Sequence, residues 1–355
     1  MVLRENYENL PQRISNMCLF YFSPLNTIQS EGASQQSQAG LHALFESIWM
    51  KIADEPELLG LEPVPDDSYM LIQSANRKPE LNLQIHQIYY QLTELFSMLL
   101  YCGYYGEICD EIMLVKNFKK RARIKIKNKN CFFNNVRLLK SLNLDLDLDQ
   151  KSDTLRIGCQ DDPKIFAAWK LLSNQNFSGD KISESGLFAF MFCCFDRNFD
   201  YLLRKAEKHW HLQPMFLTSF FMKFIEQGYQ YEWNCSIFGT SFTVYNDITG
   251  FRIQMQPAKI QQIYFRINRI IGSVKAIMDY DHLSSEAQEF IRTELADCSN
   301  CGHCMKNGKK KSIYIQNREL CIGSLWMVRD GGFPFRGEKY FDNIYAFVSA
   351  LPDYS

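Results

Sequence analysis

The chain has 355 residues, more than one ordinary domain of ~100–200 residues holds, which predicts roughly two or three domains. Hydrophobic residues make up 46% and charged residues 22%, and this composition excludes intrinsic disorder, collagen-like sequence and low complexity. The 39 Lys and Arg balance 40 Asp and Glu, so no global charge directs the chain to nucleic acid or membrane. Either role needs a local patch.

The N-terminal residues and the longest apolar run bear on the compartment. Arg4 is accompanied by Glu5 and Glu8 and no apolar stretch follows, which is not the pattern of a signal peptide. The longest apolar run, from Gly186 to Phe195, is shorter than the about 20 residues that a membrane span needs. We therefore expect a cytoplasmic protein with no membrane segment.

Twelve cysteines are distributed unevenly along the chain. Scattered thiols in a cytosolic protein usually serve as small buried hydrophobic residues. We expect this role for the eight that lie among apolar residues, namely Cys18, Cys102, Cys109, Cys131, Cys159, Cys193, Cys194 and Cys235. The other four cluster near the C-terminus and need a different explanation.

The N-terminal third is expected to be mostly helical. Residues 26–40 are rich in Ser, Gln and Gly, which predicts a flexible loop or linker. Apolar residues at helical spacing predict one helix over residues 41–53 and a longer one over residues 79–101, which Gly103 and Gly106 end.

Two stretches of alternating charge follow. Residues 121–127 place Arg and Lys on one face of an expected strand, and residues 142–149 do the same with Asp. Residues 132–141 between them predict a short helix. One hypothesis is therefore a βαβ unit in which the two charged faces pair across strands.

Helical periodicity returns over residues 163–172, 183–208, 214–227 and 286–296. We expect Asp161 or Asp162 to cap the first of these helices, and Gly228 to end the third. Ser284 or Ser285 is the expected cap of the last helix, which leads the chain into the cysteine cluster.

Strand periodicity is concentrated late in the chain. Three alternating stretches over residues 229–256 predict a small antiparallel β-meander, and residues 260–278 form an amphipathic segment after it. The expected class is α+β, with helix-rich N-terminal and central parts. We divide the chain into a mostly helical region, residues 1–115, an α+β region, residues 116–280, and a C-terminal metal-binding region, residues 281–355.

The cysteine cluster is the most specific motif. Cys298, Cys301 and Cys304 follow the spacing C-x2-C-x2-C in a polar, Gly-containing turn, and Cys321 lies further on. A zinc ion takes about four thiolate or imidazole ligands in a tetrahedron, and C-x2-C places two sulfurs on one ion. We expect the segment from Ser312 to Glu319 to be one strand of a hairpin that brings in Cys321. Nearby lysines would offset the charge of four thiolates.

Other interpretations of the cluster stay open. An iron–sulfur cluster is the main alternative, although residues 305–311 lack the Cys-Pro that completes a ferredoxin motif. A redox dithiol at Cys301 and Cys304, His303 as a ligand in place of Cys298, and four unliganded thiols are further alternatives. Because the protein fills all ligand positions, a zinc ion here is expected to be structural and not catalytic.

The motif layout resembles that of uncharacterised bacterial proteins of similar size. They share a helix, C-x-x-C-G-x-C, a Lys-rich stretch, a short strand and a further Cys near the C-terminus. The segment Asp161-Asp-Pro-Lys-Ile-Phe-Ala-Ala-Trp-Lys-Leu-Leu and the later Phe195-Asp-Arg-Asn-Phe-Asp also look similar. The resemblance covers about the last half of the chain and implies no activity.

Two basic runs, from Lys116 to Lys129 and from Lys306 to Lys311, are the candidate partner surfaces. In the first, Phe118, Phe132 and Phe133 are candidates for stacking on bases. The alternative for this run is a solvated strand face neutralised by Asp145, Asp147 and Asp149. The sequence contains no phosphate-binding loop, G-x-S-x-G or H-E-x-x-H motif.

We therefore expect a non-enzymatic protein with a structural zinc site that binds a protein or nucleic-acid partner. An iron–sulfur protein for electron transfer is the alternative. The oligomeric state does not follow from the sequence.

Overall fold

The computed structural model describes residues 9–63, 79–121, 129–177, 182–209, 211–236, 239–245, 250–255, 264–267, 279–294, 312–315, 317–321 and 338–350. Contacts divide the chain into two units, Met1–Tyr201 with Cys235–Phe238 and Leu202–Asn234 with Gly239–Ser355. The three regions predicted from the sequence stay a prediction, because contacts do not establish which parts fold independently.

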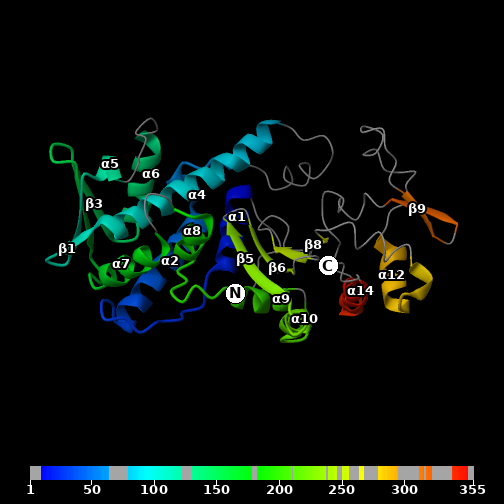
Figure 1. The fold of residues 1–355 in the computed structure, drawn as a ribbon. Helices are drawn as coiled ribbons and strands as arrows, with labels where there is room; N and C mark the ends of the chain where they lie inside the picture. The colour runs from blue at the N-terminus through cyan, green and yellow to red at the C-terminus, as the bar shows by residue number, and fades with distance from the viewer. Residues whose placement is uncertain are drawn as a thin grey trace. The chain divides into compact units, whose positions relative to one another are not determined.

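The first unit combines helices with one four-stranded sheet (Figure 1). Its helices are α1 (Leu10–Tyr21), α2 (Gln35–Asp54), η1 (Pro56–Leu59), α4 (Pro79–Tyr105), α5 (Phe118–Arg121), α6 (Lys129–Lys140), α7 (Ile165–Asn176) and α8 (Glu184–Met191). Its strands are β1 (Glu107–Cys109), β2 (Ile112–Lys116), β3 (Leu144–Asp149) and β4 (Thr154–Cys159).

Helix α2 begins earlier than predicted. Ser34 is its N-cap and accepts a hydrogen bond from the Ser37 backbone N–H at 3.1 Å. The buried Gln38 side chain holds the preceding loop, accepting from Ile28 N at 2.9 Å and donating to Ile28 O at 2.8 Å. The prediction of a flexible linker over residues 26–40 is therefore wrong from Gln35 onward, because Ser and Gln here cap and anchor a helix.

Helix α4 continues past Gly103 and ends at Tyr105, so the predicted end at Gly103 is wrong. A Cβ at Gly103 would overlap the Ser173 hydroxyl and the Trp169 ring, both on α7. Glycine is needed here for a close helix crossing and not for a helix end. The Trp169 indole N–H donates to Leu99 O at 2.8 Å across the same crossing.

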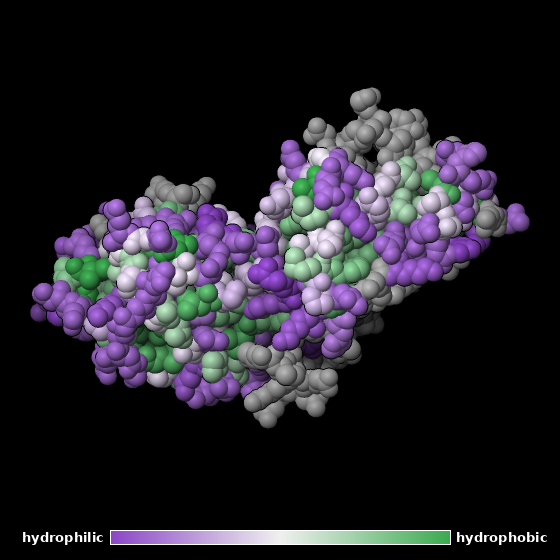
Figure 2. All heavy atoms as spheres, turned by 90° about the horizontal axis from the view of Figure 1, so that it is seen from below, coloured by the Kyte–Doolittle hydropathy of each residue, from purple (hydrophilic) through white to green (hydrophobic). Residues whose placement is uncertain are grey.

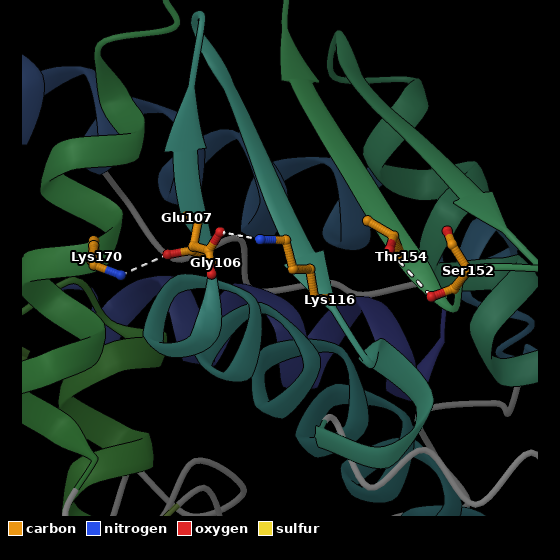
Figure 3. Close-up of polar contacts among 6 residues, drawn as sticks. All are labelled: Gly106, Glu107, Lys116, Ser152, Thr154 and Lys170. Atoms are coloured by element: carbon orange, nitrogen blue, oxygen red, sulfur yellow. Dashed lines mark hydrogen bonds and ion pairs between the residues drawn. The ribbon is translucent and has the colours of Figure 1, made fainter.

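The chain leaves α4 through Gly106. A Cβ on this glycine would lie too close to the Cys102 carbonyl, and the Gly106 carbonyl accepts a hydrogen bond from Lys170 Nζ at 2.6 Å (Figure 3). A cation at the end of α4 satisfies a backbone carbonyl and complements the helix dipole. Gly106 therefore marks the real end of this helix, as predicted.

The sheet has the order β1-β2-β4-β3, and each neighbouring pair is antiparallel. Since β2 and β3 both run opposite to β4, they are parallel to each other with β4 between them. The connection from β2 to β3 passes through α5 and α6 and makes a split βαβ unit. The predicted acidic strand and the short helix predicted before it are thus confirmed as β3 and α6.

Only Arg121 of the predicted basic strand, residues 121–127, lies within the described residues, where it ends the short helix α5. Strand β2 ends at Lys116, and Phe118–Arg121 is the short helix α5. The described partner of β3 is β4, where Asp147 lies opposite Arg156. Residues 122–127, and with them the predicted pairing of basic and acidic faces, lie outside the described residues.

The N-cap predicted for α7 is also wrong. The structure places Lys164 at that position, without a side-chain cap. Asp162 instead accepts from the Lys164 backbone N–H at 3.0 Å, which forms a turn before the helix. Asp161 accepts from the side chain of Asn143.

Aromatic rings fill the core of the first unit. Trp49 stacks on Phe96 and on Phe192, with ring centroids 4.8 and 5.6 Å apart, and its indole N–H donates to Met191 O at 2.9 Å. All of these side chains are buried. The aromatic residues of this unit therefore form a large part of its core.

The second unit contains a β-meander and a C-terminal element. Its helices are α9 (Tyr201–His209), which begins at the boundary, α10 (Phe216–Ile225), η4 (Tyr280–His282), α12 (Ser285–Glu294) and α14 (Glu338–Ser349). Its strands are β5 (Gln230–Ser236), β6 (Gly239–Tyr245), β7 (Gly250–Met255), β8 (Tyr264–Ile267), β9 (Ser312–Ile315) and β10 (Arg318–Cys321).

The meander has the strand order β5-β6-β7-β8, which confirms the prediction over residues 229–256 and adds a fourth strand. That strand, β8, falls within the segment 260–278 that the sequence predicts only as amphipathic. The α+β class is confirmed.

Helix α10 forms as predicted and covers the meander. The buried Glu207 carboxylate accepts from the backbone N–H groups of Met215 and Leu217, at 3.0 and 2.8 Å, at the start of this helix. Phe221 then packs edge-on against Phe242 of β6, with centroids 4.5 Å apart.

We predict that Gly103→Ala lowers the free energy of unfolding by about 1–3 kcal/mol, the usual cost of overpacking. Alanine is otherwise favoured over glycine inside a helix, so a loss identifies the α4–α7 crossing as its cause. Urea unfolding followed by tryptophan fluorescence measures the change. Gly158→Ala on β4 is the matched control, since the nearest atom to its Cβ would be 3.8 Å away. Equal stabilities of both variants would contradict this role of Gly103.

Candidate metal centre

The structure describes one of the four predicted ligands and the elements on either side of the other three. Cys298, Cys301 and Cys304 lie outside the described residues, and Cys321 is the last residue of β10. The candidate centre is therefore defined by the elements on either side of residues 295–311, which are α12 and the β9–β10 hairpin (Figure 1).

Helix α12 leads into the cysteine segment. Ser284 accepts from the Ala287 backbone N–H at 3.3 Å, which confirms it as one of the two predicted caps. Phe290 stacks on Phe347 of α14 with centroids 4.8 Å apart, so α12 and α14 share a core. The helix ends at Glu294, and Cys298 follows four residues later.

Residues 312–321 form a two-stranded hairpin. The sequence predicts a single strand from Ser312 to Glu319, but the chain turns at Asn317, whose φ of 64° is in the left-handed region. The antiparallel register places Cys321 opposite Ser312. Opposed Cα atoms in such a pair are about 4.5–5.5 Å apart. Cys321 therefore lies at the end of the hairpin where the chain enters from the cysteine segment.

A hydrogen bond ties the hairpin to α12. Arg318 Nη1 donates to the backbone carbonyl of Arg292 at 3.2 Å. Leu320, the next apolar residue of β10, is buried. The segment 295–311 thus begins and ends on elements that are linked to each other.

The donor set suits a thiophilic divalent metal ion. Four thiolates complete a tetrahedron with no position left for water or substrate, which is the pattern of a structural zinc site. Among the described residues no group of three or more His, Cys, Asp or Glu side chains is arranged to hold a metal ion.

The eight scattered cysteines differ from the cluster. Six of them are buried, as the sequence predicts, whereas Cys109 is exposed and Cys159 is partly exposed. Desolvation raises the pKa of Cys131 to about 11 and that of Cys194 and Cys235 to about 12. Thiols with such pKa values are poor nucleophiles and poor ligands at neutral pH.

Two lysines of the first basic run contact polar side chains within the first unit. Lys116 forms an ion pair with Glu107 at 2.7 Å (Figure 3), and Lys119 Nζ donates to Gln150 Oε1 at 3.2 Å. Phe118 is buried, so the prediction that it stacks on bases is wrong, whereas Phe133 is 63% exposed. The ion pair of Lys116 with Glu107 joins β2 to β1, and the predicted neutralisation of the basic run by Asp145, Asp147 and Asp149 stays a prediction.

The hairpin exposes one residue that the sequence analysis missed. Tyr314 on β9 is 75% exposed and lies opposite Glu319. Its setting between Ile313 and Ile315 is the available signal, because strand alternation places a residue between two apolar ones on the other face.

The surface and the comparisons add little that is specific. Hydrophobic residues emerge in patches between hydrophilic ones on the face drawn in Figure 2. Of the described helices, none has the length and apolar character to cross a membrane.

No protein-family model matches the chain, and no curated protein or solved structure matches it either. The function must therefore be argued from the residues alone.

We predict that iodoacetamide at pH 8 modifies Cys109 well before the buried thiols. At a pKa of about 11, only about one Cys131 side chain in a thousand is a thiolate at this pH. Raising the pH toward that pKa increases the thiolate fraction about tenfold per unit, so labelling of Cys131 should rise with pH. Peptide mass spectrometry measures each site, with urea-unfolded protein as the control. Equal rates at Cys131 and Cys109 in the folded protein would contradict the burial described here.

Proposed function

We propose that the C-terminal element, made of α12, residues 295–311, the β9–β10 hairpin and α14, is a zinc-stapled binding module. Its ligands are Cys298, Cys301, Cys304 and Cys321. The observation that carries the proposal is the register of the hairpin, which sets Cys321 beside Ser312, where the cysteine segment ends.

Chain length permits the four cysteines to reach one ion. Cys304 precedes Ser312 by eight residues, and an extended chain spans about 3.3–3.6 Å per residue. Position 321 falls on the same face of the hairpin as Tyr314 and Glu319, since residues two apart on a strand share a face. This is the face opposite to the buried Leu320.

The small size of the element supports a structural metal. The hairpin has four residues in each strand, and an isolated two-stranded hairpin is marginally stable at best in water. In small zinc domains, metal binding itself supplies folding free energy. A zinc ion would fix the hairpin relative to the end of α12, to which Arg318 already bonds.

The proposal assigns a binding role and no reaction. A filled tetrahedron leaves no site for substrate, and the sequence contains no motif that points to a catalytic centre elsewhere. A reducing compartment such as the cytosol is proposed with it, because the thiolate ligands must stay reduced and the eight scattered cysteines are free thiols.

Cys301→Ser is expected to abolish metal binding, because one missing thiolate opens the tetrahedron. Zinc measured by plasma mass spectrometry should fall from about one per chain to a small fraction, and the melting temperature should drop. A chelator should produce the same change in the wild type.

Cys109→Ser is the matched control, since it removes an exposed thiol outside the cluster. It should keep both the metal and the melting temperature. Wild-type protein purified anaerobically without metal, or a Cys301→Ser variant that keeps its zinc, would refute the ligand set. Iron with labile sulfide and a brown colour would instead establish the iron–sulfur alternative.

A further inference from the structure

Strand β3 lies at one edge of the four-stranded sheet of the first unit. The order β1-β2-β4-β3 leaves its outer edge without a neighbouring strand among the described residues. Just before β3, the backbone N–H of Gln160 donates to Asn143 O at 3.2 Å. Because bonded and non-bonded pairs alternate along an antiparallel ladder, the N–H and C=O groups of Leu144, Leu146 and Leu148 point away from β4, toward the outer edge.

The two faces of β3 differ in chemistry. Leu144 and Leu146 are buried, whereas Asp145, Asp147 and Asp149 are exposed. A strand added along the outer edge would place its own side chains alternately beside the leucines and beside the aspartates. The edge therefore suits a segment in which apolar and polar residues alternate.

Negative charge prevails on the exposed face of the sheet. Among the described residues of its four strands, the charged side chains there are Glu107 and Lys116, which pair with each other, Arg156 opposite Asp147, and the other two aspartates of β3. They sum to 2 − 4 = −2. The β3–β4 turn adds one lysine and one aspartate, 1 − 1 = 0, and the flanking residues 140–143 and 160–164 add 2 − 2 = 0.

This charge decides which kind of strand fits the outer edge of β3. A second copy of β3 would bring aspartates opposite aspartates, and like charges directly opposite each other are destabilising. Charged side chains on edge strands commonly prevent such pairing. Since all three side chains carry the same sign, they exclude a second copy and favour a cationic strand, so that one feature supplies both the repulsion and the attraction.

We propose that the outer edge of β3 binds an extended basic segment of a partner protein by strand addition. Backbone hydrogen bonds to the three leucines would hold the segment, and Lys or Arg at every second position would pair with the three aspartates. The apolar residues between them would lie beside the leucines. This site belongs to the first unit and is independent of the metal centre proposed for the C-terminal element.

The test is fluorescence anisotropy of the full chain with a labelled, end-capped peptide of about eight residues in which Lys and Val alternate, which spans the six residues of β3. Binding should weaken as salt increases, since exposed charges are screened. An antiparallel strand directs the N–H groups of its Val residues to β3, so N-methylation of Val should abolish binding. The peptide N-methylated at Lys has the same charge and should still bind.

Two changes in the protein act in opposite directions. Asp145→Asn together with Asp147→Asn should weaken binding roughly tenfold, because two cross-strand charge pairs are lost. Arg156→Gln should strengthen binding roughly threefold, because it removes the cation opposite Asp147, and a damaged fold would not produce a gain. Asp110→Asn with Glu111→Gln is the matched control, since it makes the same charge change at exposed residues of the β1–β2 turn and should leave the affinity unchanged.

The remaining outcomes decide the inference. Loss of binding only with the Lys-methylated peptide would show a parallel strand at the same edge and would support it. Equal affinities for both methylated peptides, equal losses in the two double variants, or no binding to the wild-type chain would overturn it. Binding that requires replacement of Arg123, Lys125 and Lys127 by Gln would show that the chain itself occupies the edge, and this also overturns it.

Discussion

The first unit depends on the close approach of α4 and α7. Gly103 removes the side chain that would separate the two helices, and the Trp169 indole then reaches Leu99 O at 2.8 Å. This contact places Lys170, one residue after Trp169, at the carbonyl of Gly106, where α4 ends. The chain leaves that point directly into β1 and β2, so the position of the sheet follows from the same crossing. The absence of a side chain at Gly103 thus permits the close packing of α4 on α7, and the position of the sheet depends on this packing.

In the described residues of the C-terminal element, α12 packs on α14. Its core includes the stacked rings of Phe290 and Phe347 between α12 and α14. The hairpin contributes the buried Leu320, and Arg318 donates a hydrogen bond to α12. A hydrogen bond of this kind contributes about 1 kcal/mol. Fixing one more residue of backbone costs a similar amount. A covalent or metal tie is the efficient way to order such a short structure, and the proposed thiolate site is such a tie.

The sequence pattern predicted those parts of the fold that short-range interactions determine. The helical rhythm of α4, the β-meander and the cap at Ser284 follow from spacing and short-range chemistry, and all three are confirmed. The errors arise where a distant contact decides. Gly103 by itself indicates a helix end, whereas its contact with Trp169 explains why a glycine lies inside the helix. The Ser/Gln-rich stretch by itself indicates a loop, whereas the hydrogen bonds of Gln38 to Ile28 order it.

The candidate site was open to prediction to a similar extent. The spacing of Cys298, Cys301 and Cys304 indicates a metal because C-x2-C is itself a local geometry. The sequence also proposes Cys321, but the proximity of its backbone to Ser312 follows only from the hairpin register. The alternation of Tyr314 with Ile313 and Ile315 indicates that it lies on the other face of the strand, but it leaves open which face meets the protein. That choice is made by Arg318, whose bond to Arg292 O lies on the side of the hairpin away from Tyr314.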